Sequence, residues 1–328
     1  MSAGLRILAA GPGVTVQDAG RRGYLRYGVT AAGPMDEWSF RIANRAAGAR
    51  EGAAALEISV GGIEATAQGA PLRLALVGGE FNARLDGVAL PTACVFSLHP
   101  GDRLVVRAGP RGAWAYLAFG GALALPSTLG SLSMHARSGL GGTGVRAGDV
   151  LPLADAQPGP SHPLALRGAP PSSAPIRAIP GPQDDYFDVA ALAAFFDSAW
   201  TVAARSDRMA YALTGPRIAH AKGFNIVSDG VAFGAIQIAG ERQPLVLMAD
   251  RAPTGGYPKI ANVVAADLGR LAQMRPGETV RFRRASVAEA VAALRVAHEA
   301  VAAGAHPSAA LSMDALLNAN LISGVTRG

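Results

Sequence analysis

Short apolar runs separated by turn residues dominate the first half of this chain, which is the pattern of β-strands. Five runs of strand length lie between positions 72 and 120 and are divided by Gly, Pro or Asp; they are 72–77, 81–85, 93–98, 103–107 and 113–119. Several short strands at this spacing are typical of a β-sandwich or a β-barrel. A further strand is predicted from residue 4 up to the Gly11-Pro12-Gly13 turn.

The second half shows a similar order of elements. Strands are predicted at 176–179 and 200–204, with a helix at about 184–196 between them and further strands up to residue 282. An alanine-rich stretch at 286–303 has helical spacing of its larger apolar residues and predicts a terminal helix. A second short helix is predicted at 312–317.

One helix is also predicted in the first half, at 36–47, where Asp36 occupies the N-cap position and Gly48 the terminating position. The segment 154–175 is rich in Pro, Gly and Ser, which is the composition of a linker. We therefore divide the chain into a first β-barrel-like subdomain at 1–165, a second subdomain at 166–286 and a helical extension at 287–328.

Composition agrees with a mainly β protein. The 328 residues include 41 Gly and 22 Pro, and only 16% are charged, which favours many turns and few long helices. The predicted fold is two β-barrel subdomains with a few short helices and a C-terminal helix. No signal-peptide pattern and no apolar run of membrane-spanning length is present, so the sequence predicts a cytoplasmic protein without a membrane segment.

The net charge of +6 comes from scattered arginines rather than from a basic block. Arg21, Arg22 and Arg26 are the nearest approach to a basic cluster, and no run of aromatic residues accompanies them. Binding of nucleic acid is therefore not expected, and acidic small substrates fit better. The single cysteine, Cys94, excludes disulfides within the chain.

The segment Thr254-Gly255-Gly256-Tyr257-Pro258-Lys259 carries the strongest candidate chemistry. Lys259 is one of two lysines among 30 lysine and arginine residues, and it follows a Gly-Gly pair and a tyrosine. Two predicted strands precede this segment, which places it at the rim of a sheet, where binding sites are often built. Gln237, Asp250 and Arg251 add polar groups nearby. The cluster predicts binding of an anion or an amide, and a simple turn is the alternative.

Three further segments have two interpretations each. Arg21 and Arg22 could bind a carboxylate or phosphate bidentately, or could pair with Asp18 at the surface. Asp36 could act chemically as well as cap a helix. In the run 206–209, Asp207 and Arg208 could pair locally or orient a substrate.

The remaining motifs argue against other chemistries. The six histidines show no metal-ligand spacing, so no metal site is predicted. No Gly-x-Ser-x-Gly elbow is present. The loop 139–144 lacks the Gly-Lys-Ser/Thr ending of a phosphate-binding P-loop and is interpreted as a hairpin.

Five motifs, taken in order, resemble the biotin-dependent carboxyltransferase family, also called allophanate hydrolase subunit two, which includes the C subunit of 5-oxoprolinase as well as the KipA proteins. The motifs are 16–23, 33–36, 206–209, 234–237 and 254–261, and the resemblance covers about residues 4 to 285. It implies a mostly β fold of two cyclophilin-like subdomains.

The resemblance also implies a function and partners. A heteromeric ATP-dependent 5-oxoprolinase would open 5-oxoproline to glutamate, with a KipI-like protein and a LamB/YcsF-like protein as the partner subunits. ATP would act through the complex, the isolated chain could be inactive, and biotin is not expected unless the carboxyltransferase alternative holds. Two alternatives stay open: a carboxyltransferase component of a biotin-dependent urea or amide carboxylase, and a KipA-type regulatory protein that binds a kinase inhibitor. A prolyl isomerase has only fold analogy behind it.

Under the 5-oxoprolinase hypothesis, we predict the site residues from their residue type and their position in the motifs. Asp36, Asp250 and Lys259 are the predicted catalytic residues: the carboxylates as bases or orienting groups, and the lysine as partner of the substrate carboxylate or of the activated oxygen. The predicted substrate-binding residues are Gln17, Arg22, Gln237, Thr254, Gly255, Gly256 and Tyr257.

Overall fold

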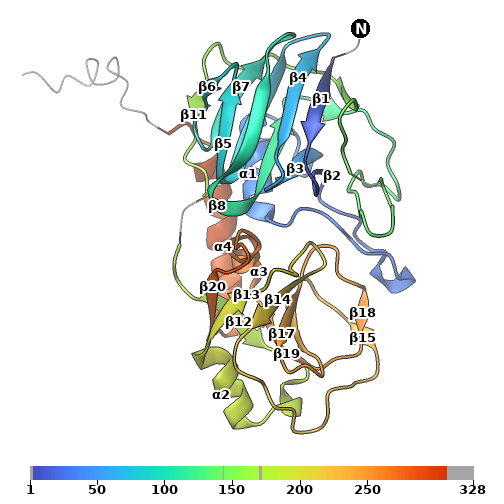
Figure 1. Ribbon diagram of the computed structural model, residues 1–328, viewed down its shortest axis with the longest axis vertical. Coiled ribbons are helices and arrows are strands. Elements are labelled where there is room, and N and C mark those ends of the chain that lie inside the picture. The colour runs from blue at the N-terminus through green and yellow to red at the C-terminus, as the bar shows by residue number, and fades with distance from the viewer. Residues whose placement is uncertain (1–2, 143, 170–171, 309–328) are drawn as a thin grey trace, which may run out of the picture.

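The computed structural model describes residues 3–142, 144–169 and 172–308, and it shows a mainly β molecule (Figure 1). Two β units follow one another along the long axis of the molecule. The upper unit in Figure 1 is an open sheet built from the first half of the chain, and the lower unit is a closed barrel built from the second half. They are called the sheet and the barrel below.

The sheet has eleven strands arranged around a long central pair, β5 (Leu72–Leu85) and β8 (Leu104–Phe119). Each of these strands was predicted as two short ones. The pair continues through the expected break because Gly78 lets the backbones approach closely: a Cβ there would lie 2.4 Å from the carbonyl oxygen of Trp114. The other strands are β1 (Gly4–Ala10), β2 (Thr15–Gln17), β3 (Ala55–Ser59), β4 (Ile63–Gln68), β6 (Val88–Ala89), β7 (Cys94–Leu98), β9 (Ala122–Leu123), β10 (Val150–Ala154) and β11 (Leu164–Ala165).

The barrel closes through seven strands in the order β12-β19-β16-β17-β14-β13-β20. A parallel pair completes the ring, in which Ile176 of β12 lies opposite Phe282 of β20. The predictions of a mainly β protein and of a barrel are thus confirmed. The strands are β12 (Ile176–Pro180), β13 (Ala199–Val202), β14 (Ala210–Thr214), β16 (Ala235–Ile238), β17 (Pro244–Leu247), β19 (Lys259–Val263) and β20 (Thr279–Arg284). A separate two-stranded ribbon pairs β15 (Asp229–Gly230) with β18 (Thr254–Gly255).

Four α-helices are present among the described residues: α1 (Glu37–Ala47), α2 (Val189–Asp197), α3 (Ala265–Ala272) and α4 (Val287–Gly304). The predictions of α1, with Asp36 as its cap, and of α4 are confirmed. The predicted helix at 184–196 is instead a short 3-10 turn, η2 (Asp184–Tyr186), followed by α2, because Asp188 caps a new helix start. A second turn, η1 (Leu25–Tyr27), lies in the N-terminal loop. The predicted helix at 312–317 lies outside the described residues.

A shared hydrophobic core joins the sheet to the barrel. Phe40 of α1 and Tyr116 of β8 belong to the same buried cluster as Trp200 and Ile236 of the barrel. Helix α4 adds a second connection, since it packs against α3 and β12 on the barrel side and against α1 on the sheet side. Because the interface contains a continuous hydrophobic core, the two units are expected to hold a fixed relative position.

Candidate functional site

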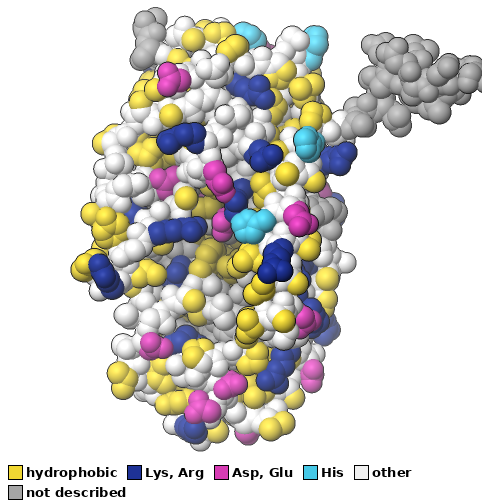
Figure 2. Space-filling model, turned by 180° about the vertical axis from the view of Figure 1, so that it is seen from behind, with side chains coloured by type: hydrophobic (Ala, Val, Ile, Leu, Met, Phe, Trp, Pro, Cys, Tyr) yellow, Lys and Arg dark blue, Asp and Glu magenta, His cyan; other side chains and the backbone are white. Residues whose placement is uncertain are grey.

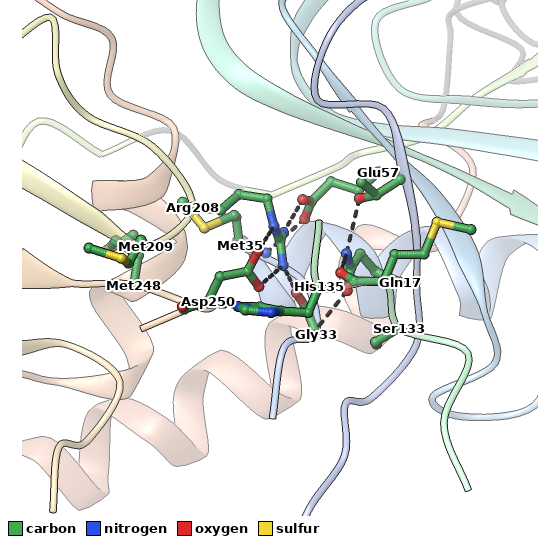
Figure 3. A network of polar contacts seen from close by, with 12 residues as sticks. Gln17, Gly33, Met35, Glu57, Ser133, His135, Arg208, Met209, Met248 and Asp250 are labelled. Carbon is green, nitrogen blue, oxygen red and sulfur yellow. Dashed lines mark hydrogen bonds and ion pairs between the residues drawn. The ribbon is translucent and has the colours of Figure 1, made fainter. Parts of the chain in front are cut away.

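An arginine lies at the centre of the interface between sheet and barrel (Figure 3). Arg208 donates from Nε to Oδ2 of Asp250 at 3.0 Å and from Nη2 to Oδ1 at 2.7 Å. Nη2 also donates to the carbonyl oxygen of Gly33 at 2.8 Å, and Nη1 donates to Glu57. Glu57 belongs to β3 of the sheet, whereas Asp250 follows β17 of the barrel. One side chain therefore ties the two units together.

This arginine stays charged although it is buried. Only 9% of the Arg208 side chain and none of the Glu57 side chain is exposed. Burial alone would lower the pKa of Arg208, but the charges of Glu57 and Asp250 raise it above its ordinary value. The second Glu57 oxygen is satisfied as well, because it accepts from the Tyr116 hydroxyl at 2.7 Å and from the Met35 N–H at 2.8 Å.

Asp36, a predicted catalytic residue, continues this network as the cap of α1. Its Oδ1 accepts the N–H groups of Trp38 and Ser39, both at 3.2 Å. Its Oδ2 accepts the Ser39 hydroxyl at 2.7 Å and Nε2 of Gln273, the residue that ends α3, at 2.8 Å. Both carboxylate oxygens are thus occupied by structural donors.

The N-terminal loop is held by side chains that point inward. Gln17 is fully buried; its Nε2 donates to the carbonyl oxygen of Met134 at 2.8 Å, and its Oε1 accepts the N–H of Gly33 at 3.1 Å. Asp18 accepts the hydroxyls of Ser131 at 2.6 Å and Ser133 at 2.7 Å. Burial opposes ionisation of Asp18, but these hydrogen bonds lower its pKa below the ordinary value of 3.8. The loop is therefore fixed to the 131–134 segment.

The two neighbouring arginines of this loop have different surroundings. Arg21 is 1% exposed and donates to the carbonyl oxygens of Thr128 and Ser133, so it is a structural residue rather than a surface partner of Asp18. Arg22 is exposed and has no hydrogen-bond or ion-pair partner among the described residues. The structure does not bring Arg22 into contact with the other predicted site residues.

A second polar cluster, which we name the barrel-end site, consists of Asp229, Gln237, Gly255, Tyr257 and Lys259. Lys259 is the central group: its Nζ donates to Oδ2 of Asp229 at 3.0 Å, with 4% of the lysine side chain exposed against 55% of the aspartate. The hydrogen bond from Lys259 is the main cause of a lowered pKa of Asp229. Nε2 of Gln237 faces the carbonyl oxygen of Tyr257 at 3.4 Å.

The strand register explains why these residues meet. Gln237 of β16 lies opposite Lys259 of β19, and Asp229 of β15 lies opposite Gly255 of β18. The ribbon therefore covers the end of the barrel at which Gln237 and Lys259 are placed. The ribbon packs very closely against Gln237, since a Cβ on Gly255 would be 2.5 Å from Nε2 of Gln237.

A cavity of about 390 Å³ opens beside the ribbon, between it and the η1 turn. Thr254 is the predicted site residue that lines it. The lining residues are Leu25, Arg26, Gly230, Val231, Ala232, Pro253 and Thr254. A second cavity, of about 280 Å³, is lined by residues 10–14 and 144–147 and contains none of the predicted site residues.

Apart from the exposed Arg22, the predicted residues fall into two groups. Gln17, Asp36 and Asp250 lie in the interface network, whereas Gln237, Lys259 and residues 254–257 lie at the barrel end. Sequence reasoning missed Asp229, which pairs with Lys259, and Gln183, whose side chain also bonds Asp229. No sequence signal marks either residue: Asp229 belongs to the two-residue strand β15 and Gln183 lies in a turn, and both are distant in sequence from the motif they complete.

The surface gives little sign of other ligands. Positive and negative side chains are interspersed on the face shown in Figure 2 rather than gathered by sign. Within residues 3–142, 144–169 and 172–308, no group of three or more His, Cys, Asp or Glu side chains is arranged to hold a metal ion. No helix in these ranges is long and apolar enough to cross a membrane.

Comparison with known proteins identifies the family. Residues 27–284 match the model of the carboxyltransferase domain, subdomains A and B. This chain is a member of that carboxyltransferase family. The resemblance drawn from the five motifs is thereby confirmed.

Several relatives of this carboxyltransferase-family chain are named as enzymes or as parts of enzymes. It is 35% identical over 294 residues to the 5-oxoprolinase C subunit of Escherichia coli, which is 88% of this chain and 94% of that protein. The Haemophilus influenzae protein of the same name is 34% identical and matches 84% of this chain and 89% of its own length. Urea amidolyase of Saccharomyces cerevisiae is 28% identical over 85% of this chain, but over only 16% of its own length.

Solved structures agree with this assignment. The crystal structure of TTHA0988 is 34% identical, with a TM-score of 0.76, and the match covers 86% of this carboxyltransferase-family chain and 55% of TTHA0988. The Kluyveromyces lactis urea amidolyase structure has a TM-score of 0.83 at 28% identity and covers 95% of this chain. The chain spans about half of TTHA0988 and 20% of the urea amidolyase.

The interface network predicts that replacing Arg208 destabilises the protein much more than replacing Arg205, three positions earlier. Arg208→Met should lower the free energy of unfolding by about 3–5 kcal/mol, because it leaves Glu57 and Asp250 buried without their cation. Arg205→Met removes a pair with Glu241 in which both side chains are more than 60% exposed, and should cost about 1 kcal/mol or less. Urea denaturation measures both values; equal effects would refute the role given to Arg208.

Asp18 predicts a stability difference that depends on pH. Asp18→Asn should destabilise the protein by about 1–3 kcal/mol at pH 7, because an amide nitrogen replaces one acceptor oxygen among several donors. The pKa of Asp18 in the folded protein is below its ordinary value of 3.8. The charged carboxylate therefore makes its full contribution to the free energy of unfolding at pH values above the ordinary pKa, and this contribution is lost as the pH falls through the pKa of the folded protein. The difference in the free energy of unfolding between wild type and Asp18→Asn, measured by urea denaturation, should be smaller at pH 3 than at pH 7. A difference that does not change with pH would contradict this prediction.

Proposed function

We propose that this protein is the C subunit of a heteromeric ATP-dependent 5-oxoprolinase. The identity to two proteins that carry this subunit name, over 94% and 89% of their lengths, supports the assignment. The structural observation that carries it is the barrel-end site, where a buried ammonium and an amide side chain lie under a ribbon whose residues Gly230 and Thr254 line a cavity. Such a pair of groups fits a small cyclic amide that bears a carboxylate.

Lys259 is the central binding group in this proposal. Its stem is buried in the barrel, so the position of the ammonium is fixed, whereas its partner Asp229 is largely exposed and lies on the two-stranded ribbon. A substrate carboxylate can replace Asp229 on Nζ without leaving a buried charge unpaired. Alternatively the same ammonium can stabilise the lactam oxygen once negative charge develops there.

Gln237 supplies the complementary amide recognition. An amide side chain carries both a donor and an acceptor, which match the C=O and N–H of a lactam. Gln237 is 3% exposed, and within the part of the chain that the structure describes its Nε2 has one hydrogen-bond acceptor, the carbonyl of Tyr257, at the long distance of 3.4 Å. A substrate that displaces the ribbon from Gln237 would offer this group a better partner.

Asp36 and Asp250 have a different role in this proposal. All four of their carboxylate oxygens accept hydrogen bonds from α1, Gln273 or Arg208, so neither is free to take a proton from water. We assign both to positioning: they fix the sheet against the barrel. The activation of the lactam, a poor electrophile, is assigned to ATP-dependent phosphorylation of its oxygen within the complex.

The proposal includes two partner proteins. A KipI-like protein and a LamB/YcsF-like protein would complete the enzyme, and ATP would bind in the complex rather than in a site of this chain alone. The match covers about half of TTHA0988, so a unit like this one is joined there to further sequence. That arrangement supports association of this chain with a partner.

Carboxyl transfer from carboxybiotin to a urea-like nitrogen is the second candidate. The TM-score of 0.83 to urea amidolyase over 95% of this chain supports it. The barrel-end site would then bind the N–C=O group of the acceptor. Turnover that requires a biotinylated carrier, with no ATP hydrolysis driven by 5-oxoproline in the three-protein mixture, would favour this candidate over the first.

Replacing Lys259 tests the proposed function. The chain is coexpressed with its KipI-like and LamB/YcsF-like partners, and 5-oxoproline-dependent ATP hydrolysis is measured for wild type, Lys259→Met and Lys222→Met. Lys259→Met should lower kcat/KM by roughly 100-fold or more, because a preorganised cation is lost. Lys222 is 55% exposed and pairs with Asp185, so its variant should retain wild-type turnover. Full activity of a folded Lys259→Met complex would remove this lysine from the site.

The ribbon predicts different effects for two adjacent glycines. Gly255→Ala brings a Cβ within 2.5 Å of Nε2 of Gln237, so the ribbon or the amide must move, and turnover should fall about 10- to 100-fold. At Gly256 the nearest atom would be 3.5 Å away, an ordinary contact, and Gly256→Ala should be nearly silent. Neither glycine has a positive φ, so strain does not confound the pair. Equal activities in the same coupled assay would exclude close packing of the ribbon as a requirement.

A further inference from the structure

A serine and a histidine outside the barrel-end site form a close pair. The hydroxyl of Ser138 lies 2.6 Å from Nδ1 of His135, within the loop that connects β9 to β10. His135 is 7% exposed, whereas Ser138 is exposed to solvent. Neither residue has a role in the function proposed above.

The partner of the other ring nitrogen defines the protonation of this histidine. Nε2 lies 3.3 Å from the carbonyl oxygen of Asp250, and a carbonyl only accepts hydrogen bonds, so Nε2 carries the proton (Figure 3). In the neutral imidazole Nδ1 then has the free lone pair, and the hydroxyl of Ser138 must donate to it. A hydroxyl, a base and a third group that orients the base are the arrangement of an activated nucleophile.

The orientation of the base depends on the joined sheet and barrel. Asp250 belongs to the barrel, and its carboxylate is held by Arg208, while its N–H donates to the carbonyl oxygen of Arg208 at 2.8 Å. The loop of His135 is tied to the barrel again through a contact of Arg137 with the sulfur of Met209. The imidazole is therefore fixed between two rigid units rather than free to rotate.

We propose that Ser138 is a nucleophile with His135 as its general base, and that the pair accepts acyl groups from activated carboxylic esters. Oγ forms a bond to the carbonyl carbon, and the bond from that carbon to the leaving oxygen breaks. The Oγ proton passes to Nδ1 of His135 and from there to the departing alkoxide or phenolate. Water then hydrolyses the acyl-serine, which releases a carboxylic acid and restores the hydroxyl. Asp250 acts as a positioning residue through its carbonyl.

A fluorophosphonate probe tests the nucleophile directly on the full-length chain. Attack by Oγ forms an O–P bond, fluoride leaves and the proton passes to His135, so the chain should gain at Ser138 the mass of one probe less that of HF. Ser138→Ala should abolish the modification. His135→Gln retains the serine but lacks the base, and labelling should slow by about 100-fold or more. The same variants should lose p-nitrophenyl acetate hydrolysis in parallel.

Ser172 provides a matched control. Its hydroxyl accepts the N–H two residues onward at 3.3 Å, as Ser138 accepts that of Leu140 at 3.4 Å, and it has no histidine partner among the described residues. Ser172→Ala should label like wild type. Peptide mapping of the wild-type protein decides the proposal even if the His135 variant unfolds: absence of label, or label at any residue other than Ser138, overturns it.

Discussion

The buried guanidinium of Arg208 sets the geometry on which the rest of this molecule depends. It meets a carboxylate from the sheet, a carboxylate from the barrel and a backbone carbonyl from the loop before α1. A charge in this position is tolerated only while all of these acceptors stay in place, because each alternative arrangement buries an unpaired ion. The apolar core around it supplies most of the attraction between sheet and barrel. The ionic network selects one relative orientation among those that the apolar contacts alone would allow.

Local sequence signals predicted much of the fold. They failed where contacts between residues distant in sequence determine the structure. Helix α1 follows from its cap, its apolar spacing and Gly48, which are all adjacent in sequence. The continuous β5–β8 pair does not, because Gly78 predicts a break until the close approach of Trp114 is known. Helix α3 escaped prediction since it has eight residues and no side-chain cap. Closure of the barrel by the parallel β12–β20 pair joins residues about a hundred positions apart, and no local pattern encodes it.

The candidate site was likewise predictable in part: residue type could be interpreted from the sequence, whereas the surroundings of each side chain could not. The segment 254–259 could be identified because its unusual residues are contiguous, and Lys259 is indeed a buried cation. Asp36 and Asp250 were selected as chemically able carboxylates, which residue type supports, but only the structure reveals how many donors occupy their oxygens. Asp229 has an ordinary sequence context and becomes notable only through its contact with Lys259.

One short segment connects the interface network to the barrel-end site. The side chain of Asp250 binds Arg208 and its carbonyl faces His135, while four residues later Thr254 enters the ribbon that covers Lys259. Arg251 anchors this segment to the barrel. It is 6% exposed, and its Nε donates to the carbonyl of Val231 at 2.9 Å. Burial lowers its pKa to about 10, so it remains charged at neutral pH. Because Asp250 is fixed by Arg208 and Arg251 is fixed by the carbonyl of Val231, the interface between sheet and barrel positions the chain segment that leads into the ribbon.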